Sequence, residues 1–237
     1  HIFGVPCNMN AIKKLSDEYD IPILEDAAES LGSKFNNQHT GTFGSIGVYS
    51  FNGNKLLSTS GGGVIITDNK DKADKMRFLS TQAKDAMPYY HHTEIGYNYR
   101  MSNVIAAIGV GQMEVIEDRI KRTREINKTY RKELGKYFYS FQEESPTDRS
   151  NMWLTCAILN GENKPEDLIS HLEKDNIEAR RLWKPMHEQP VLNKYLKYIN
   201  GNSSLLFLQG ICLPSGSNMT DADLKRVIKS IKNFFNK

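Results

Sequence analysis

Apolar and polar positions in the first half of the chain predict short strands that alternate with helices. Apolar residues recur at helical spacing over 9–19, which predicts a helix, and a short apolar run over 22–26 predicts a strand. Further strands are predicted over 47–51 and 64–67, followed by a helix over 70–79. Such alternation indicates helices packed on a largely parallel sheet, which is the α/β layer architecture.

A helical pattern over 102–134 changes its character midway. Its first half is apolar nearly all round, whereas its second half carries only an apolar stripe among charged residues. This change predicts one long helix, buried at its first end, that leaves the core of one domain and bridges to the next.

The remaining chain has the pattern of a small α+β domain. Strands are predicted over 152–159 and 177–182, and a helix over 165–174. A terminal helix is indicated by a capping box of Thr220 and Asp223 and by core-facing Leu224, Val227, Ile228, Ile231 and Phe235. We therefore expect one domain over 1–115, an interdomain helix and connection over 116–144, and a small domain over 145–237.

Composition narrows the class of protein. The 237 residues are 39% hydrophobic and 25% charged, as in ordinary globular proteins. A net charge of +3 without a block of like charge suggests neither nucleic acid nor an anionic membrane as a partner. No run reaches the ~18 apolar residues of a membrane span. Cys7, Cys156 and Cys212 form no C-x-x-C pair, so we expect neither a zinc site nor a disulfide framework, and a cytoplasmic location.

Lys55 is the first candidate for chemistry. It lies in SFNGNKLLSTSGGG (50–63), between Gly53-Asn54 and Leu56-Leu57, which predicts a half-buried side chain. Burial disfavours the charged form of a lysine, as Schiff-base chemistry requires. Most lysines are structural or solvated, so the surroundings of Lys55 alone leave both interpretations open.

Asp26 and Ser50 end two consecutive predicted strands, and Lys55 follows shortly after the second. Ligands of open α/β sheets bind at the carboxyl ends of strands, so an acid, a hydroxyl and an amine are expected at one ligand-binding edge. Asp26 could instead cap the turn that begins at Ala27, and the spacing does not decide between these roles.

Two further motifs have simpler interpretations. Gly61-Gly62-Gly63 lacks the lysine and spacing of a phosphate-binding P-loop and predicts a tight turn. His91-His92 lack a spaced third ligand, so we expect a surface or substrate-lining loop and no metal site.

The segments ILEDAAES, GTFGSIGVYSFNGNKLLSTSGGGVI and GYNYRMSNVIAAIG, in this order, resemble the pyridoxal-phosphate-dependent nucleotide-sugar aminotransferases of the DegT/StrS type. The resemblance continues through RSNMWLTCAI, IEARRLWKPMHEQP and CLPSGSN and so covers essentially the whole chain. It implies an α/β fold of the fold type I, aspartate aminotransferase-like class, with residues 1–115 as the C-terminal part of an incomplete large domain and a small α+β domain after it.

The resemblance also implies roles for individual residues around pyridoxal 5'-phosphate. Lys55 would be the Schiff-base lysine and the general acid and base, and Asp26 would pair with the pyridine nitrogen. Ser50 would bind the phosphate, and Glu29 would lie near the phenolic oxygen, where many relatives carry glutamine. Asn98 would reach the phosphate of the neighbouring subunit's cofactor, which implies a homodimer.

The substrate is implied less directly. Within the family the chain most resembles the enzymes of the bacillosamine branch, which aminate the 4-keto group of a UDP-linked 4-keto-6-deoxy-N-acetylhexosamine for bacterial glycans or glycoproteins. Glutamate is the expected amino donor. Arg180, Trp183, Lys184 and His187 are similar to the family's nucleotide-sugar contacts, since cationic and aromatic groups suit a pyrophosphate and a uracil.

Two alternatives remain beside amino transfer. A dehydratase of the same family would carry histidine in place of Lys55, and a silent nucleotide-sugar binding module would have no use for a Schiff-base lysine. Family members are markedly longer, and the chain opens at His1 without an initiator methionine. We therefore expect a fragment, or a chain completed by another, that aggregates or binds cofactor weakly by itself.

Overall fold

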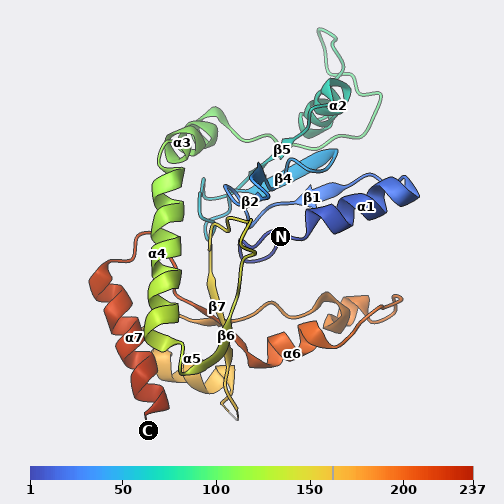
Figure 1. Cartoon of the computed structure of the whole chain (residues 1–237). Helices are drawn as coiled ribbons and strands as arrows, with labels where there is room; N and C mark the ends of the chain where they lie inside the picture. Colours follow the sequence, from blue (N-terminus) through green and yellow to red (C-terminus); the bar gives the residue numbers. More distant parts are fainter. Residues whose placement is uncertain (162, 237) are drawn as a thin grey trace. The chain divides into compact units, whose positions relative to one another are not determined.

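The computed structural model describes residues 1–161 and 163–236, which form two compact units (Figure 1). The first unit contains residues 1–119 and 144–151, and the second contains residues 120–143 and the chain from Met152 onward. This division differs from the predicted boundaries, because residues 144–151 return to the first unit and the helix assigned to the connection is shared between both units.

A three-stranded sheet forms the centre of the first unit. Its order is β1 (Leu24–Asp26), β4 (Ile46–Ser50) and β5 (Gly63–Ile66). β1 and β4 are parallel, as predicted, but β5 runs antiparallel to β4, so the described sheet is mixed and not largely parallel. The loop between β4 and β5 is short enough to return the chain directly, without a crossover helix.

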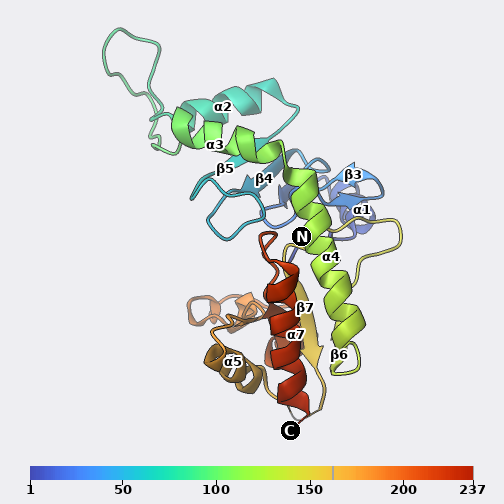
Figure 2. The same ribbon diagram turned by 90° about the vertical axis from the view of Figure 1, so that its left-hand side faces the viewer.

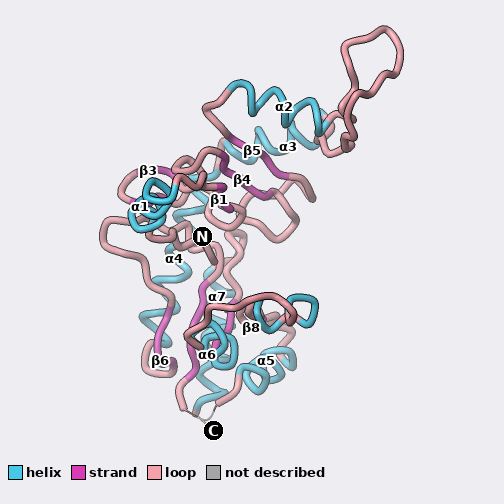
Figure 3. Tube along the Cα trace, turned by 90° about the vertical axis from the view of Figure 1, so that its right-hand side faces the viewer, coloured by secondary structure: helices cyan, strands magenta, loops and turns pink. Residues whose placement is uncertain are grey.

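The helices of the first unit begin at side-chain caps. α1 (Met9–Tyr19) is capped by Asn8, whose Oδ1 accepts from Ala11 N at 3.1 Å, and α2 (Lys70–Ser80) is capped by Asn69. Both helices occupy the predicted ranges. A small hairpin of β2 (Lys34–Phe35) and β3 (Gln38–His39) was not predicted. The chain between α2 and α3 is a long loop (Figure 3).

The predicted long helix over 102–134 is two helices, α3 (Asn103–Met113) and α4 (Ile116–Leu134), separated by a turn at Glu114-Val115. The expected burial of its first half is also wrong within the described chain: Val104 is 72% exposed and Gly109 is the buried residue of α3. The apolar stripe of α4 is buried, as its spacing predicts.

The second unit contains a four-stranded antiparallel sheet. Its order is β6 (Phe138–Phe141), β7 (Thr155–Leu159), β9 (Gly210–Leu213) and β8 (Arg180–Arg181). The predicted strands over 152–159 and 177–182 are therefore shorter than expected, and β6 and β9 were missed. One face of the sheet packs on α4, α5 (Pro165–Lys174) and α7 (Asp221–Phe235); this core includes Ile126, Leu134, Ala157, Leu172, Ile211 and Ile231.

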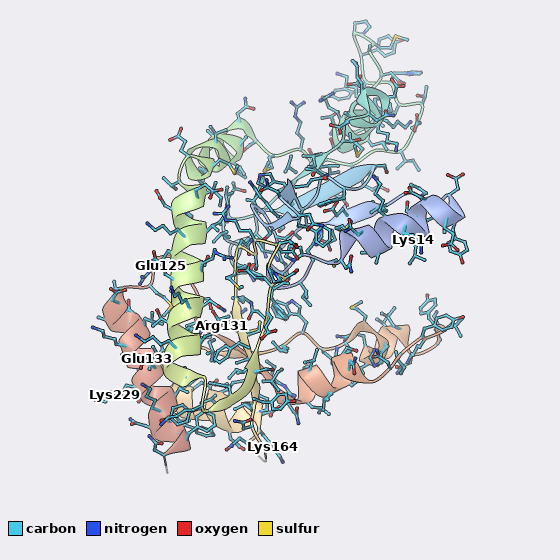
Figure 4. All side chains as sticks on the ribbon, in the orientation of Figure 1. Lys14, Glu125, Arg131, Glu133, Lys164 and Lys229 are labelled. Carbon is cyan, nitrogen blue, oxygen red and sulfur yellow. The ribbon has the colours of Figure 1, made fainter. Side chains whose placement is uncertain are left out.

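The terminal helix α7 forms as the sequence predicts. Thr220 Oγ1 accepts from Asp223 N at 3.1 Å, and Asp223 Oδ2 accepts from Thr220 N at 3.0 Å, so the capping box is confirmed. The expected core residues are buried, except that Phe235 is only partly buried. α7 lies alongside α4 (Figure 2), and Lys232 Nζ contacts Glu133 Oε2 at 2.7 Å. Figure 4 labels Glu133 on α4.

A short helix, α6 (Asn202–Gln209), leads directly into β9. Two single turns of 3-10 helix, η1 (Met186–Glu188) and η2 (Pro190–Leu192), precede it. In Figure 1, α6 lies on the side of the second unit's sheet away from α4 and α7. None of the residues of α6 is buried.

The segment Glu144–Asn151 completes the first unit from a distant part of the chain. Lys34 and Arg149 exchange two backbone hydrogen bonds of 2.8 Å. Asn151 Nδ2 donates to the carbonyl oxygens of Glu29 and Leu31, each at 3.0 Å, and Asn151 N donates to Ser33 Oγ at 2.9 Å. This segment therefore fixes the turn that follows β1. Among the described residues, no helix is long and apolar enough to cross a membrane.

Candidate functional site

Asp26 and Ser50 project from one face of the first unit's sheet. Asp26 pairs with Val48 across the parallel strands, and Ser50 lies two residues beyond Val48 on β4. Because side chains two residues apart point to the same face, the carboxylate and the hydroxyl share a face at the carboxyl ends of both strands. Both lie where the sequence predicted a ligand-binding edge.

Asp26 also has the local role that the sequence left open. Its Oδ1 accepts from Ala28 N at 3.0 Å, which fixes the turn after β1, and Ala27 N donates to Val48 O at 2.9 Å. The Asp26 side chain remains exposed. A carboxylate has lone pairs for both roles, so the turn does not exclude binding of a ligand.

Lys55 is held close to Glu29. Lys55 Nζ lies 3.5 Å from Glu29 Oε1, and the two side chains are only 15% and 16% exposed. Glu29 Oε2 accepts from Phe3 N at 2.7 Å. The half-buried surroundings predicted for Lys55 are confirmed, since Leu57 beside it is 1% exposed. An amine and a carboxylate are thus brought together from two loops that follow adjacent strands.

The loop that carries Lys55 is closed on itself. Phe51 N donates to Gly62 O and Thr59 N donates to Phe51 O, both at 2.9 Å. The glycine run makes the predicted turn: Gly62 has a φ of +91°, and a Cβ there would lie 2.7 Å from Met101 Sδ.

The start of α4 and the end of α3 support the same loop. Arg119 Nη1 donates to Leu56 O at 3.3 Å, next to Lys55. On α3, Gln112 Oε1 lies 3.5 Å from Ser58 N, and Gly109 packs so closely that a Cβ would lie 3.2 Å from Thr59 Cγ2. These contacts hold the backbone on the C-terminal side of Lys55.

Glu25 lies on the opposite face from Asp26 and was not recognised from the sequence. Its carboxylate is buried and accepts from Phe43 N at 2.9 Å, from Gly44 N at 3.2 Å, from Gly41 N and from His1 Nε2 at 2.8 Å. Burial alone would raise the pKa of Glu25, but the hydrogen bonds from His1 and the backbone outweigh it and hold the pKa below its ordinary value. An acid within the short apolar run over 22–26 was the available signal.

Four predicted substrate contacts lie in the second unit, around the end of β8. Arg180 Nε donates to Glu178 Oε1 at 2.7 Å, and Lys184 is exposed. His187 Nε2 lies 3.1 Å from Ser204 Oγ. The Trp183 ring is 39% exposed and lies 6.4 Å from the buried ring of Trp153, so it is supported from one side and open on the other.

Arg181 is a second residue that the sequence analysis missed. Its guanidinium lies 4.1 Å from the Phe207 ring centroid, Nη2 donates to Phe207 O at 2.6 Å, and Nη1 pairs with Glu166. Within the described part of the chain, Arg181 Nε is buried and has no hydrogen-bond partner. A second arginine beside Arg180 was the only sequence signal.

Asn98 lies in the long loop between α2 and α3, where it forms an isolated β-bridge with Thr81. Its side chain is exposed. His91 and His92 occupy the same loop, as predicted, with His91 Nδ1 2.7 Å from Asp85 Oδ2. Residues 1–161 and 163–236 contain no cluster of histidine, cysteine and acidic side chains suited to a metal ion.

A pocket of about 720 Å³ lies between β5, α2 and the end of this loop. Its lining includes Val64, Met76, Tyr97 and Arg100, but none of Asp26, Glu29, Ser50 and Lys55. We place the candidate chemistry at Lys55 because an amine, two carboxylates and a hydroxyl converge on the carboxyl ends of β1 and β4 there, whereas the pocket is mainly apolar.

The chain is similar to several known proteins. It is 42% identical over 240 residues to EpsN of Bacillus subtilis (strain 168), whose name assigns it provisionally to the pyridoxal phosphate-dependent aminotransferases, covering 99% of this chain and 62% of EpsN. It is 35% identical over 239 residues to the GDP-perosamine synthase of Vibrio cholerae, covering 100% of this chain and 65% of that protein.

A solved structure has the same fold as this chain. A DegT DnrJ EryC1 StrS aminotransferase from Brucella abortus superposes with a TM-score of 0.89 at 26% identity, covering 100% of this chain and 63% of that one. This chain thus spans just under two thirds of the length of the relatives it matches. Residues 1–232 match the sequence model of the DegT/DnrJ/EryC1/StrS aminotransferase family. The chain therefore belongs to this family.

Proposed function

We propose that the protein is a pyridoxal-phosphate-dependent aminotransferase that transfers an amino group from glutamate to the 4-keto carbon of a UDP-4-keto-6-deoxy-N-acetylhexosamine. The observation that carries the proposal is the shielded Lys55 amine beside Glu29, at the same strand ends as Asp26 and Ser50. Amino transfer needs such an amine, and a binding module does not.

The residues present fit this cofactor. The exposed Asp26 carboxylate would hold a proton on the pyridine nitrogen, and the Ser50 hydroxyl would donate to the phosphate. When bound, pyridoxal phosphate supplies an aldehyde that reacts with amines and a ring that accepts electrons. A solved structure of the same fold, 19% identical to this chain, is titled the PLP form of a Streptococcus pneumoniae protein provisionally assigned as a sugar aminotransferase.

Lys55 would both carry the cofactor and move the proton. Its Nζ lies in a loop closed by backbone hydrogen bonds and supported by Arg119. This support limits the positions of Nζ, and a positioned amine is what general acid-base transfer requires. Glu29 is held as a hydrogen-bond acceptor by Phe3 N, so we propose that it orients Lys55 as well as lying near the cofactor.

Arg180, Trp183, Lys184 and His187 are proposed to contact the nucleotide part of the substrate. The half-exposed Trp183 ring, backed by Trp153, suits stacking on a uracil. Arg180 and Lys184 suit the pyrophosphate. The relatives differ in nucleotide: one of 35% identity is named a GDP-perosamine synthase, and one of 27% identity, from Campylobacter jejuni, is named a UDP-4-amino-4,6-dideoxy-N-acetyl-beta-L-altrosamine transaminase.

We also propose a homodimer in which Asn98 reaches the cofactor phosphate of the neighbouring subunit. The exposed side chain of Asn98 is compatible with this contact. Apolar side chains exposed nearby in the sequence support an interface, among them Ile95 (86%), Tyr99 (76%) and Val110 (66%).

Reductive trapping tests the assignment of Lys55. The whole enzyme, with any residues that precede His1 in the natural protein, is loaded with pyridoxal phosphate, reduced with borohydride and digested. We expect the label on the peptide that contains Lys55 and its loss in Lys55→Ala, while the matched variant Lys84→Ala, on the exposed loop, keeps it. A label that maps to another lysine would contradict the assignment.

Half-reactions test the substrate. Glutamate should abolish the absorbance of the aldehyde form, and the accepted 4-keto sugar nucleotide should restore it as a 4-amino sugar forms. UDP- and GDP-linked 4-keto-6-deoxy sugars are compared at equal concentration. If only the GDP-linked sugar restores the aldehyde absorbance, the proposed UDP-linked substrate is wrong. If the sugar loses a hydroxyl and gains no amino group, the enzyme is a dehydratase.

A further inference from the structure

Two cysteines that lie far apart in the sequence are cross-strand neighbours in the second unit. Cys156 on β7 is directly opposite Cys212 on β9, and their Sγ atoms are 3.7 Å apart. Neither cysteine is in a disulfide bond, and both side chains are only 4% exposed. The sequence showed no pairing because the strands that bring them together are 56 positions apart.

The backbone places the two cysteines at a position that suits a disulfide. Gln142 N donates to Cys156 O at 3.1 Å, and Cys156 N donates to Gln142 Oε1, so both backbone groups of Cys156 point toward β6. Cys156 and Cys212 therefore form a non-hydrogen-bonded pair, in which Cα atoms are about 4.5 Å apart. That separation is within the usual disulfide span of about 4.4–6.8 Å.

The thiols lie on the sheet face opposite the main core. Ala157 and Ile211, the neighbours of Cys156 and Cys212 in sequence, belong to the core formed with α4, α5 and α7. Side chains alternate along a strand, so the thiols face the other way. On that face a Cβ added at Gly210 of β9 would meet the side chain of Leu182 and the backbone oxygen of Leu206 in α6. α6 has eight residues, none of them buried, and a helix this short has little stability of its own in water.

We propose that Cys156 and Cys212 are an oxidation site at which a hydroperoxide forms an intramolecular disulfide between β7 and β9. One thiol reduces the hydroperoxide to an alcohol, or to water where the oxidant is hydrogen peroxide, and becomes a sulfenic acid. The second sulfur then attacks the first, the S–S bond forms and water leaves. In total, two thiols lose two hydrogens and one peroxide bond is reduced.

Formation of the bond needs only a small movement. The sulfurs must approach from 3.7 Å to the bonding distance of about 2 Å, which side-chain rotation can supply when the backbone is already paired. Cys212 Sγ also lies 3.8 Å from Arg181 O, so the rotation would draw this sulfur from β8 toward β7. The site does not depend on the proposed aminotransferase activity.

Peptide mapping of the whole chain tests the site. The reduced, folded protein is treated with hydrogen peroxide, its remaining thiols are blocked with a maleimide, and it is digested without reductant. We expect one linked peptide pair containing Cys156 and Cys212, lighter by two hydrogens and separated by dithiothreitol. Cys7→Ser should keep the link, whereas Cys156→Ser should lose it.

Three outcomes would overturn the proposal. The first is accumulation of sulfinic acid at Cys156 or Cys212 without a disulfide between them, and the second is a disulfide that involves Cys7. The third is a Cys156–Cys212 disulfide that forms only after urea unfolds the protein. The first measurement uses the unaltered chain, so a variant that folds poorly does not affect it.

Discussion

Neighbouring residues on β1 have opposite roles, because Glu25 and Asp26 project from opposite faces of the sheet. Glu25 is buried among backbone N–H donors, while Asp26 is exposed beside the lysine-bearing loop. We therefore expect a substitution at Glu25 to lower stability and a substitution at Asp26 to lower activity.

The carboxylate of Glu25 should make stability depend on pH. Its folded pKa is lowered, so its contribution is present above the unfolded value of 4.5 and is lost as pH falls through the folded value. As pH falls from 7 to well below 4.5 we expect the thermal midpoint of the unaltered chain to fall more than that of Glu25→Gln, measured by circular dichroism. At pH 7 Glu25→Gln should lose roughly 1–3 kcal/mol, because an amide satisfies fewer of the donors. Equal stability of the two proteins at pH 7 would contradict the role.

Asp26→Asn should act on the chemistry instead. The amide oxygen can still accept from Ala28 N, so the thermal midpoint should change little. An amide cannot hold a proton on the ring nitrogen, and turnover of the whole enzyme should fall about 10²-fold or more. Asp17→Asn, on the exposed surface of α1, is the control for activity. Near-normal turnover of Asp26→Asn would remove Asp26 from the proposed site.

At the scale of elements, sequence patterns predicted what local chemistry determines. α1 and α5 have the expected ranges and α7 begins at the expected cap, because helical spacing and capping depend on residues close together in the sequence. β6, β9 and the two-residue β8 were missed or overextended because their limits depend on strands distant in sequence. The sequence pattern placed Asp26 and Ser50 at strand ends and Lys55 just beyond, and the family resemblance implied their roles, which stay predictions. The contacts of Glu25 and Arg181 depend on partners that only the fold supplies.

The capping box of α7 gives a local prediction. Thr220→Ala removes the acceptor for Asp223 N and should cost about 1 kcal/mol. Urea unfolding followed by tryptophan fluorescence measures this loss, since Trp153 and Trp183 both belong to the second unit. The control is Thr129→Ala inside α4, where alanine is the better helix former, so stability should stay the same or rise slightly. Equal effects of both substitutions would show that the cap contributes nothing.

At the scale of the whole molecule, the two units differ in how much apolar surface they bury. The second unit has a continuous core formed by three strands (β6, β7 and β9) and three helices (α4, α5 and α7), while the sheet of the first unit packs on a small cluster of Ala27, Tyr49, Phe51 and Leu57. Leu24 and Ile65 of that sheet are 66% and 49% exposed. The first unit should therefore be the less stable one in the isolated chain.

Urea should unfold the isolated chain in two steps. We expect amide hydrogen exchange of β1 and β4 to lose protection at a lower urea concentration than the tryptophan transition of the second unit. Leu172→Ala, in the core of the second unit, should cost about 2–5 kcal/mol and shift only the tryptophan transition. Coincident transitions for both probes would show that the units unfold together.

The return of residues 144–151 to the first unit has a consequence for synthesis on the ribosome. The turn that carries Glu29 receives hydrogen bonds from Asn151, and Lys34 pairs with Arg149. A nascent chain that has released only the segment up to α3 lacks these partners, although it already contains Asp26, Ser50 and Lys55. The first unit can form its final hydrogen bonds only after α4 and β6 have also been translated. Folding of the first unit is therefore completed only after β6, the first strand of the second unit, has left the exit tunnel.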